Sequence, residues 1–206
     1  MGFFRIFKPI VLPLKRRRDI FRLLRAVRKP DVKIVVGASD IFDKGWVPTD
    51  MEFLNLLKEG DWKNYFKPDM ISTILAEHVW EHLTPEQGEL AAKHCFKYLK
   101  HGGHLRIAIP DGNHPKPEYI EHVRVGGTGP GAYDHKVLYT YKTLTAMLQR
   151  VGFEVKLLEY FDENGRFHET PWKTEDGFIH RSKYHDKRNA GGELNYTSLI
   201  ADAVKP

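Results

Sequence analysis

Residues 71–112 hold the pattern that most constrains the fold of this chain. An apolar run at 71–75 is followed by a polar elbow, a helical pattern, a Gly-Gly turn and a second apolar run at 105–109. Two buried strands joined by a helix form a parallel strand–helix–strand unit. Polar residues follow both strands, and open parallel sheets bind ligands at the carboxyl ends of their strands. The pattern therefore predicts an α/β sheet and the edge where its functional site lies.

The composition is that of one globular domain. The chain has 206 residues, of which 29% are charged and 41% hydrophobic, enough to build a sizeable core. Its one cysteine, Cys95, excludes an intramolecular disulfide and a cysteine-based zinc site, and its helical surroundings indicate a small core residue. A chain with a single cysteine needs no oxidising compartment, so we expect a cytoplasmic protein.

The positive charge is concentrated at the N-terminus. Residues 1–30 hold ten lysines and arginines and one acid, Asp19, whereas the whole chain has a net charge of +5. The rest of the chain is therefore net acidic, and without a recognition motif this argues against a nucleic-acid-binding protein. Two prolines interrupt the apolar run of this arm, so it predicts neither a membrane-spanning helix nor a signal peptide.

Part of this basic arm has an amphipathic pattern. A helix is expected at 19–27, with an apolar face made of Ile20, Leu23, Leu24 and Val27. We favour a helix that packs on the domain with its arginines in solvent, and the alternative is peripheral contact with an anionic membrane surface. The chain is accordingly divided into a basic N-terminal arm or helix, 1–30, and a folded domain, 31–206.

The remaining helices and strands are predicted from hydrophobic periodicity and from residues that start or end helices. Thr84, Pro85 and Gln87 predict the start of a helix, because threonine caps, proline suits the first turn and glutamine completes a capping box. Glycines end this helix and two others. Strands are expected at 31–36, 46–50, 71–75, 105–109, 153–160 and 196–204, and helices at 51–60, 85–100 and 141–151.

Two phrases, LAEHVWEHL (75–83) and FKYLKHGGHLRIAIPDG (96–112), carry a family resemblance. Over residues 31–204 the chain resembles class I S-adenosylmethionine-dependent methyltransferases, and within them small members associated with glycan and polysaccharide modification. The resemblance implies a Rossmann-like fold with a central, mostly parallel seven-stranded sheet flanked by helices. It also implies S-adenosylmethionine as cofactor, S-adenosylhomocysteine as product and O-methylation of a hydroxyl on a sugar or glycan acceptor.

The resemblance places the methionine part of the cofactor on the loop after the first strand. The family has several glycines there, whereas this chain keeps Gly37 and continues with Ala38 and Ser39, whose Cβ atoms limit close approach. This departure motivates an alternative, a degenerate methyltransferase fold that binds a ligand or partner without catalysis. Cofactor and substrate would meet at the residues after strand 71–75, namely Ala76, Glu77 and His78.

Two further segments are candidates for cofactor contacts. Asp50, followed by Met51, ends the second strand, where a carboxylate can accept hydrogen bonds from both ribose hydroxyls. Its alternative role is to cap the expected helix 51–60. Asp61 and Trp62 stand where the family binds adenine, and the alternative for them is a turn acid and a core aromatic residue.

Methyl transfer to a sugar hydroxyl needs a base or a metal ion, because that hydroxyl has a high pKa. His135 is the preferred base, with the neighbouring Asp134 to orient it, and Asp111 would bind a substrate hydroxyl or assist the base. The alternatives are a surface or helix-start role for His135 and a turn-capping role for Asp111. The aromatic and charged stretch 161–184 would form part of the acceptor wall.

A metal interpretation of the elbow is not favoured. Glu77, His78, Glu81 and His82 form E-H-x-x-E-H, whereas zinc peptidases place glutamate directly after the first histidine. A divalent cation at Asp111 and Asp134 is an alternative without a defined ligand set, so no metal ligand is assigned.

Overall fold

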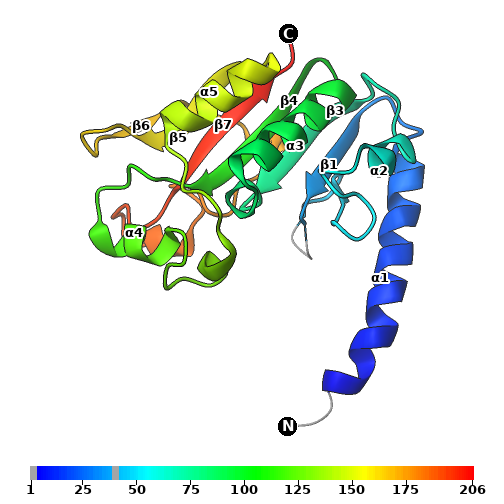
Figure 1. Ribbon diagram of the computed structural model, residues 1–206, viewed down its shortest axis with the longest axis horizontal. Coiled ribbons are helices and arrows are strands. Elements are labelled where there is room, and N and C mark those ends of the chain that lie inside the picture. The colour runs from blue at the N-terminus through cyan, green and yellow to red at the C-terminus, as the bar shows by residue number, and fades with distance from the viewer. Residues whose placement is uncertain (1–3, 39–41) are drawn as a thin grey trace.

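Within residues 4–38 and 42–206, which the computed structural model describes with side chains from residue 14 onward, seven strands form one sheet (Figure 1). Their order is β2-β1-β3-β4-β7-β5-β6. The strands are β1 (Val32–Val36), β2 (Val47–Pro48), β3 (Ile71–Glu77), β4 (Leu99–Pro110), β5 (Glu154–Phe161), β6 (Phe167–Glu169) and β7 (Ser198–Val204). The α-helices of this part of the chain are α1 (Phe4–Ala26), α2 (Glu59–Lys63), α3 (Pro85–Tyr98), α4 (Pro117–Val123) and α5 (Tyr141–Val151).

The sheet is mixed. The pairs β2/β1, β1/β3 and β3/β4 are parallel, and the pairs β4/β7, β7/β5 and β5/β6 are antiparallel. The expectation of seven strands is confirmed, and the expectation of a mostly parallel sheet is corrected. The reason is the last part of the chain, which returns after a long irregular segment and inserts β7 between β4 and β5.

Local signals correctly predicted two helices. Thr84 Oγ1 accepts a hydrogen bond from the Gln87 amide, and the Gln87 side chain accepts one from the Thr84 amide, which completes the capping box of α3. Helix α5 ends at Gly152, whose φ of 112° suits glycine. Both helices depend on contacts within a few residues, which explains why the sequence predicts them well.

The expected helix at 51–60 is wrong. The Asp50 carbonyl accepts hydrogen bonds from the Phe53 and Leu54 amides in a turn, and α2 begins only at Glu59. The Asn55 side chain accepts a hydrogen bond from the Leu57 amide, a local bond that competes with helix formation. The segment buries its apolar side chains as turns instead.

Helices cover one face of the sheet. Alternate strand residues such as Ile34, Ile74 and Ile107 pack in one cluster with residues of α3 and α5, including the fully buried Cys95. The other residues of the same strands, such as Leu75, pack with side chains outside the helices, including those of Trp46, Ile179 and Trp172. The expected flanking by helices is therefore found on one face, and irregular chain covers the other.

Buried carboxylates hold this irregular chain in place. The Glu159 carboxylate, fully buried in β5, accepts hydrogen bonds from the Trp172 indole, the Lys183 amide and the Thr197 hydroxyl. A buried charge is retained when several donors satisfy it. These bonds fix the chain on both sides of residues 178–181, three of which line the cavity described below.

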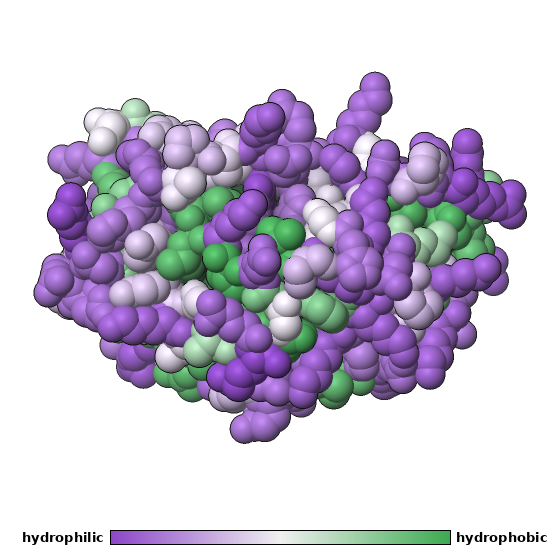
Figure 2. Space-filling model, turned by 90° about the horizontal axis from the view of Figure 1, so that it is seen from above, coloured by the Kyte–Doolittle hydropathy of each residue, from purple (hydrophilic) through white to green (hydrophobic). Residues whose placement is uncertain are grey.

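Helix α1 contains the predicted amphipathic segment and is longer than expected. Leu23 is fully buried, and Ile20 and Val27 pack against the core. Leu24, expected on the same apolar face, is exposed instead, as is Phe21. Figure 1 shows the N-terminal half of α1 extending away from the sheet. None of the helices described in 4–38 and 42–206 combines the length and apolar character needed to cross a membrane. The surface seen in Figure 2 is mainly hydrophilic, with a smaller apolar area near its centre.

Candidate functional site

A cavity of about 360 Å³ lies at the carboxyl ends of β1 and β3. These strands are neighbours in the sheet, but the chain passes through β2 on the other side of β1 between them. Such a reversal of strand order opens a crevice in an α/β sheet, and ligands bind there. Four segments line the cavity: the end of β1 with the loop after it, the end of β3 with its elbow, the turn at 130–135, and residues 178–181.

Five of the predicted site residues line this cavity. They come from three separate parts of the sequence: Gly37, Ala38, Glu77, His78 and His135. Ser39 lies outside the described residues. The other predicted residues are not among those that line the cavity, and they occupy four different places: Asp50, Met51, Asp61, Trp62, Ala76, Asp111 and Asp134.

The backbone at position 37 requires glycine. Its φ is +61°, and a Cβ atom at this position would lie 2.8 Å from Cγ2 of Val79 in the elbow after β3. Glycine thus lets the end of β1 turn away from the sheet close to the elbow. The next amide, of Ala38, donates a hydrogen bond to the Thr49 carbonyl, which extends the contact between β1 and β2.

The segment after β2 keeps its acids in local hydrogen bonds. Asp50 Oδ1 accepts a hydrogen bond from the Met51 amide at 2.7 Å. Asp50 therefore caps a turn, and the helix that it was expected to cap is absent from the described segment. Met51 is largely exposed. Asp61 Oδ2 accepts one from the Asn55 amide at 2.9 Å. These contacts fold the 50–61 segment and leave it at the β2 side of the sheet.

Trp62 and Ala76 belong to the core. The Trp62 side chain is fully buried, and its ring stacks on Tyr98 with centroids 5.2 Å apart. Ala76 is fully buried in β3. The packing corrects the expected contact of the Trp62 ring with adenine, because no face of that ring is free for a ligand.

Asp111 joins the ends of two strands. Its carboxylate is buried and accepts hydrogen bonds from the Asn113 amide at 2.9 Å and from the Phe161 amide at 2.7 Å. Burial raises the pKa of Asp111 to about 6, against the effect of these two donors. The turn-capping alternative fits this geometry, and the carboxylate is bonded to backbone amides after β4 and at the end of β5 and does not line the cavity.

Asp134 contacts His82 and Lys136 and does not orient His135. Its carboxylate lies 3.3 Å from His82 Nδ1 and 2.8 Å from Lys136 Nζ, and the lysine lowers the pKa of Asp134. His135 Nδ1 instead lies 2.7 Å from the Val123 carbonyl. The expected pairing of sequence neighbours is therefore replaced by two pairings with residues from other segments.

The elbow after β3 carries the polar groups of the cavity. His78 has a φ of 55°, a conformation unusual for any residue but glycine, and its amide donates to the Ala108 carbonyl. Its Nδ1 lies 2.8 Å from Glu81 Oε1, and its Nε2 lies 3.1 Å from Ser198 Oγ. Burial by itself would raise the pKa of Glu81, but His78, a backbone hydrogen bond and His82 together lower that pKa.

The stretch 161–184, expected to form part of the acceptor wall, contributes residues 178–181 to the cavity, but sequence reasoning singled out none of these residues. Glu77 accepts hydrogen bonds from the His180 and Arg181 amides, at 3.2 and 2.8 Å, and both of these residues line the cavity together with Phe178. Residues 161–195 have no periodicity from which such contacts could be inferred. Glu81 could have been found from the E-H-x-x-E-H pattern, which places it one helical turn from His78.

Comparisons with known proteins bear on the fold. No protein-family model and no curated protein sequence matches the chain. Among solved structures, it is similar to an S-adenosylmethionine-dependent methyltransferase from Archaeoglobus fulgidus, with a TM-score of 0.50, 13% identity and coverage of 94% of both chains. The chain has the class I methyltransferase fold.

A second structure similar to the chain is an S-adenosylmethionine-dependent methyltransferase from Thermotoga maritima, with a TM-score of 0.48 and 15% identity. The alignment covers 99% of this chain and 100% of that one. In the methyltransferase fold of this chain, the cavity lies at the reversal of strand order. Identities this low support the fold alone, so activity has to be argued from the residues of the site.

Proposed function

We propose that this chain is an S-adenosylmethionine-dependent methyltransferase that binds its cofactor in the cavity at the ends of β1 and β3. The observation that carries the proposal is the position of this cavity, at the reversal of strand order of a methyltransferase fold and beside Gly37. Its volume of about 360 Å³ lies within the range of small-molecule sites.

The chemistry of the lining fits this cofactor. S-adenosylmethionine carries an ammonium group, a sulfonium centre and a carboxylate, and it supplies a methyl group activated by the sulfonium. The acids Asp43 and Glu77 suit the two cationic groups, Arg181 suits the carboxylate, and Phe178 offers an apolar ring. We further propose that Asp50, at the end of β2, binds the ribose hydroxyls.

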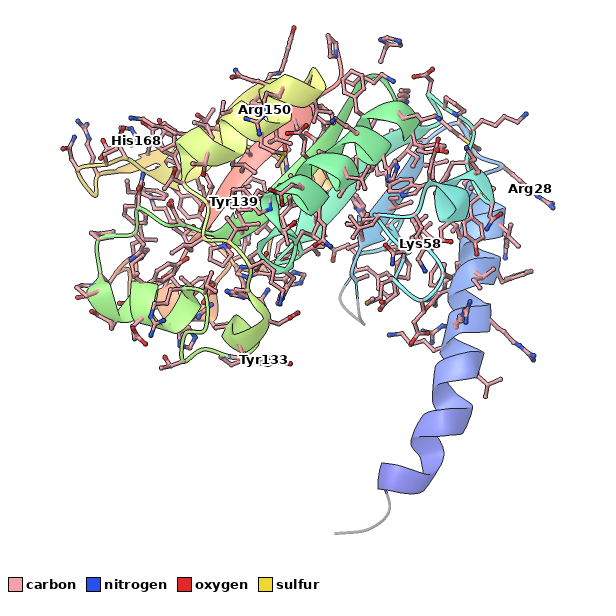
Figure 3. All side chains as sticks on the ribbon, viewed as in Figure 1. Arg28, Lys58, Tyr133, Tyr139, Arg150 and His168 are labelled. Atoms are coloured by element: carbon pink, nitrogen blue, oxygen red, sulfur yellow. The ribbon has the colours of Figure 1, made fainter. Side chains whose placement is uncertain are left out.

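We propose that the acceptor is a hydroxyl of a sugar or glycan and that His135 removes its proton. The Val123 carbonyl can only accept a hydrogen bond, so Nδ1 of His135 carries the proton and Nε2 keeps a lone pair. Tyr133, in the same turn, is 84% exposed and extends from the surface in Figure 3. An exposed aromatic ring of this kind stacks well on a sugar.

A second proposal is a ligand-binding protein without catalysis. The observation that favours it is the Ala38 amide, which is already bonded to the Thr49 carbonyl and therefore has no hydrogen to offer a ligand. Cofactor binding without turnover on any acceptor would support this second proposal over the first.

The first experiment is calorimetric titration with S-adenosylmethionine and S-adenosylhomocysteine, followed by an acceptor screen that begins with sugars. We expect binding of both ligands and methyl transfer to a hydroxyl. Replacement of His135 by alanine should keep the affinity for S-adenosylhomocysteine and abolish turnover. Absence of binding by folded protein at millimolar ligand would contradict the proposed function.

We also propose that α1 gives a cytoplasmic protein peripheral contact with an anionic membrane surface. The exposed apolar side chains Leu14, Phe21 and Leu24 alternate along the helix with arginines that are exposed as well. Apolar side chains can enter the headgroup region while arginines bind anionic lipids.

A further inference from the structure

Three potential metal ligands converge at one side of the cavity. Glu81, His82 and His135 each offer one ligand atom, and these atoms all lie within 4.8 Å of one another. Glu81 and His82 come from the short 3₁₀ helix Trp80–His82, and His135 follows the turn at 130–134. The Lys136 amide donates to the Glu81 carbonyl at 2.7 Å and so ties the two segments together.

The Glu81 carboxylate is poorly satisfied for a buried charge. Glu81 is 1% exposed, and its Oε2 atom has no hydrogen-bond partner among the described residues. Its Oε1 atom lies 2.8 Å from His78 Nδ1. A buried carboxylate oxygen without a donor is costly, and a cation bound beside it would remove that cost.

Both histidines have an acceptor close to Nδ1. His135 Nδ1 lies 2.7 Å from the Val123 carbonyl, and His82 Nδ1 lies 3.3 Å from the Asp134 carboxylate. The Val123 carbonyl holds the proton of His135 on Nδ1 and leaves the lone pair on Nε2, and the Asp134 carboxylate favours the same tautomer of His82. Histidine ligands of metals commonly donate their second ring nitrogen to a carbonyl or carboxylate in this way.

We propose that Glu81, His82 and His135 bind a divalent transition-metal ion. Two imidazoles and one carboxylate form a ligand set that suits zinc(II) and related ions and leaves coordination positions open toward the cavity. Asp134 and the Val123 carbonyl orient the two imidazoles. The site differs from the cation site considered from the sequence, because the Asp111 carboxylate accepts a hydrogen bond from the Phe161 amide at the end of β5.

The use of this ion in catalysis rests on the proposed function. An acceptor hydroxyl bound at an open position would lose its proton more readily, because the cation stabilises the alkoxide. In the metal-bound protein Nε2 of His135 would be a ligand and could not take the proton. The ion would lower the pKa of the bound hydroxyl, and the proton would pass to solvent water. Binding of the ion itself depends only on the three ligands and does not require the methyltransferase activity.

The test is calorimetric titration of the full chain with zinc chloride, and with cobalt(II) as a spectroscopic probe. We expect one equivalent of zinc to bind and cobalt(II) to give visible d–d bands. Glu81→Gln and His82→Asn should each lower the zinc affinity at least tenfold. The matched control is His180→Gln, which changes another histidine of the cavity outside the cluster and should leave the affinity unchanged.

Circular dichroism of each variant shows whether it is folded, and a cobalt(II) titration of His135→Gln supplies a second test of the ligand set. Absence of zinc binding by the folded wild-type chain, or equal affinity in folded Glu81→Gln, would overturn the proposal. Affinity for S-adenosylhomocysteine, measured on the same samples without metal, reports on the proposed function separately. Loss of zinc binding with retained S-adenosylhomocysteine binding in Glu81→Gln therefore supports the metal site on its own.

Discussion

Arg106 in β4 and Asp202 in β7 stand directly opposite each other in the antiparallel register, and the guanidinium donates two hydrogen bonds to the carboxylate, at 2.7 and 2.8 Å. Arg106 is 1% exposed and also donates to the carbonyls of Lys173 and Gly177. One buried guanidinium thus joins the sheet to the irregular chain that continues into the cavity wall.

Removal of the Asp202 carboxylate should leave the Arg106 guanidinium buried without a counter-charge. We expect Asp202→Leu to lower the free energy of unfolding by about 3 kcal/mol or more, measured by urea denaturation. The double variant Arg106→Met with Asp202→Leu should recover part of this loss, because both charges are then absent. Equal stability of Asp202→Leu and the wild type would contradict a buried ion pair.

Substitution of Trp62 should lower the stability of the fold and leave cofactor affinity unchanged. Its ring is fully buried against Tyr98, so Trp62→Ala creates a cavity and should cost about 3–5 kcal/mol of unfolding free energy. Affinity for S-adenosylhomocysteine, measured by calorimetry well below the unfolding temperature, should match that of the wild type. If the more conservative Trp62→Phe selectively lost affinity for S-adenosylhomocysteine, the result would support a contact between the Trp62 ring and adenine.

Asp50 tests the proposed ribose contact. Asp50→Asn should lower the affinity for S-adenosylhomocysteine at least tenfold, because a charged acceptor of two hydroxyl groups is lost. The comparison variant is Asp43→Asn, since Asp43 lines the cavity and Asp50 does not. If calorimetry finds a large loss for Asp43→Asn and none for Asp50→Asn, then Asp43 is the ribose ligand.

The buried imidazole of His114 should make the fold sensitive to acid. Burial lowers the pKa of His114 to about 4, and its ring stacks on Tyr119 with centroids 3.8 Å apart. The unfolded chain takes up the proton near pH 6.5 and the folded protein only near pH 4, so stability is complete above pH 6.5 and falls as the pH drops toward 4. Relative to His114→Asn, the wild type should lose about 3 kcal/mol over this range in urea titrations. A pH-independent difference would show that the folded imidazole titrates normally.

The exposed face of α1 should bind anionic vesicles. We expect the protein to sediment with vesicles that contain phosphatidylglycerol and to stay in solution with pure phosphatidylcholine. Phe21→Glu with Leu24→Glu should abolish sedimentation, because both side chains are exposed on this helix. Leu90→Glu, at an exposed position of α3, is the control and should sediment like the wild type. Equal sedimentation of all three proteins would exclude α1 as the contact.

The sequence predicted those features whose contacts are local. The α3 capping box joins Thr84 to Gln87, and α5 stops at Gly152, so both depend on a few neighbouring residues. The buried strands β1, β3 and β4 were found from their apolar runs. The prediction failed at 51–60, where an apolar pattern close to a helical one is folded as turns by Asn55 and Asp61.

For the site, adjacency in sequence was a poor guide to contact in space. Asp134 and His135 are neighbours along the chain, but Asp134 contacts His82 and His135 contacts the Val123 carbonyl. Side chains of consecutive residues in extended or turn backbone point in different directions, so their partners come from whatever segment packs against each. For the same reason, the sequence does not show that Glu81 lies beside both His82 and His135, which the tertiary structure brings together.

Short stretches of the sequence encode the α/β class, the positions of six of the seven described strands and of helices α3 and α5, and the edge of the sheet where polar residues gather, because periodicity, caps and strand ends depend on neighbouring residues. The tertiary structure alone decided the mixed direction of the sheet, the burial of Trp62 and the irregular cover held by Arg106 and Glu159. It also decided which histidines meet. These features depend on packing between segments far apart in the chain, where the free energy of burial and the pairing of buried charges outweigh local preference.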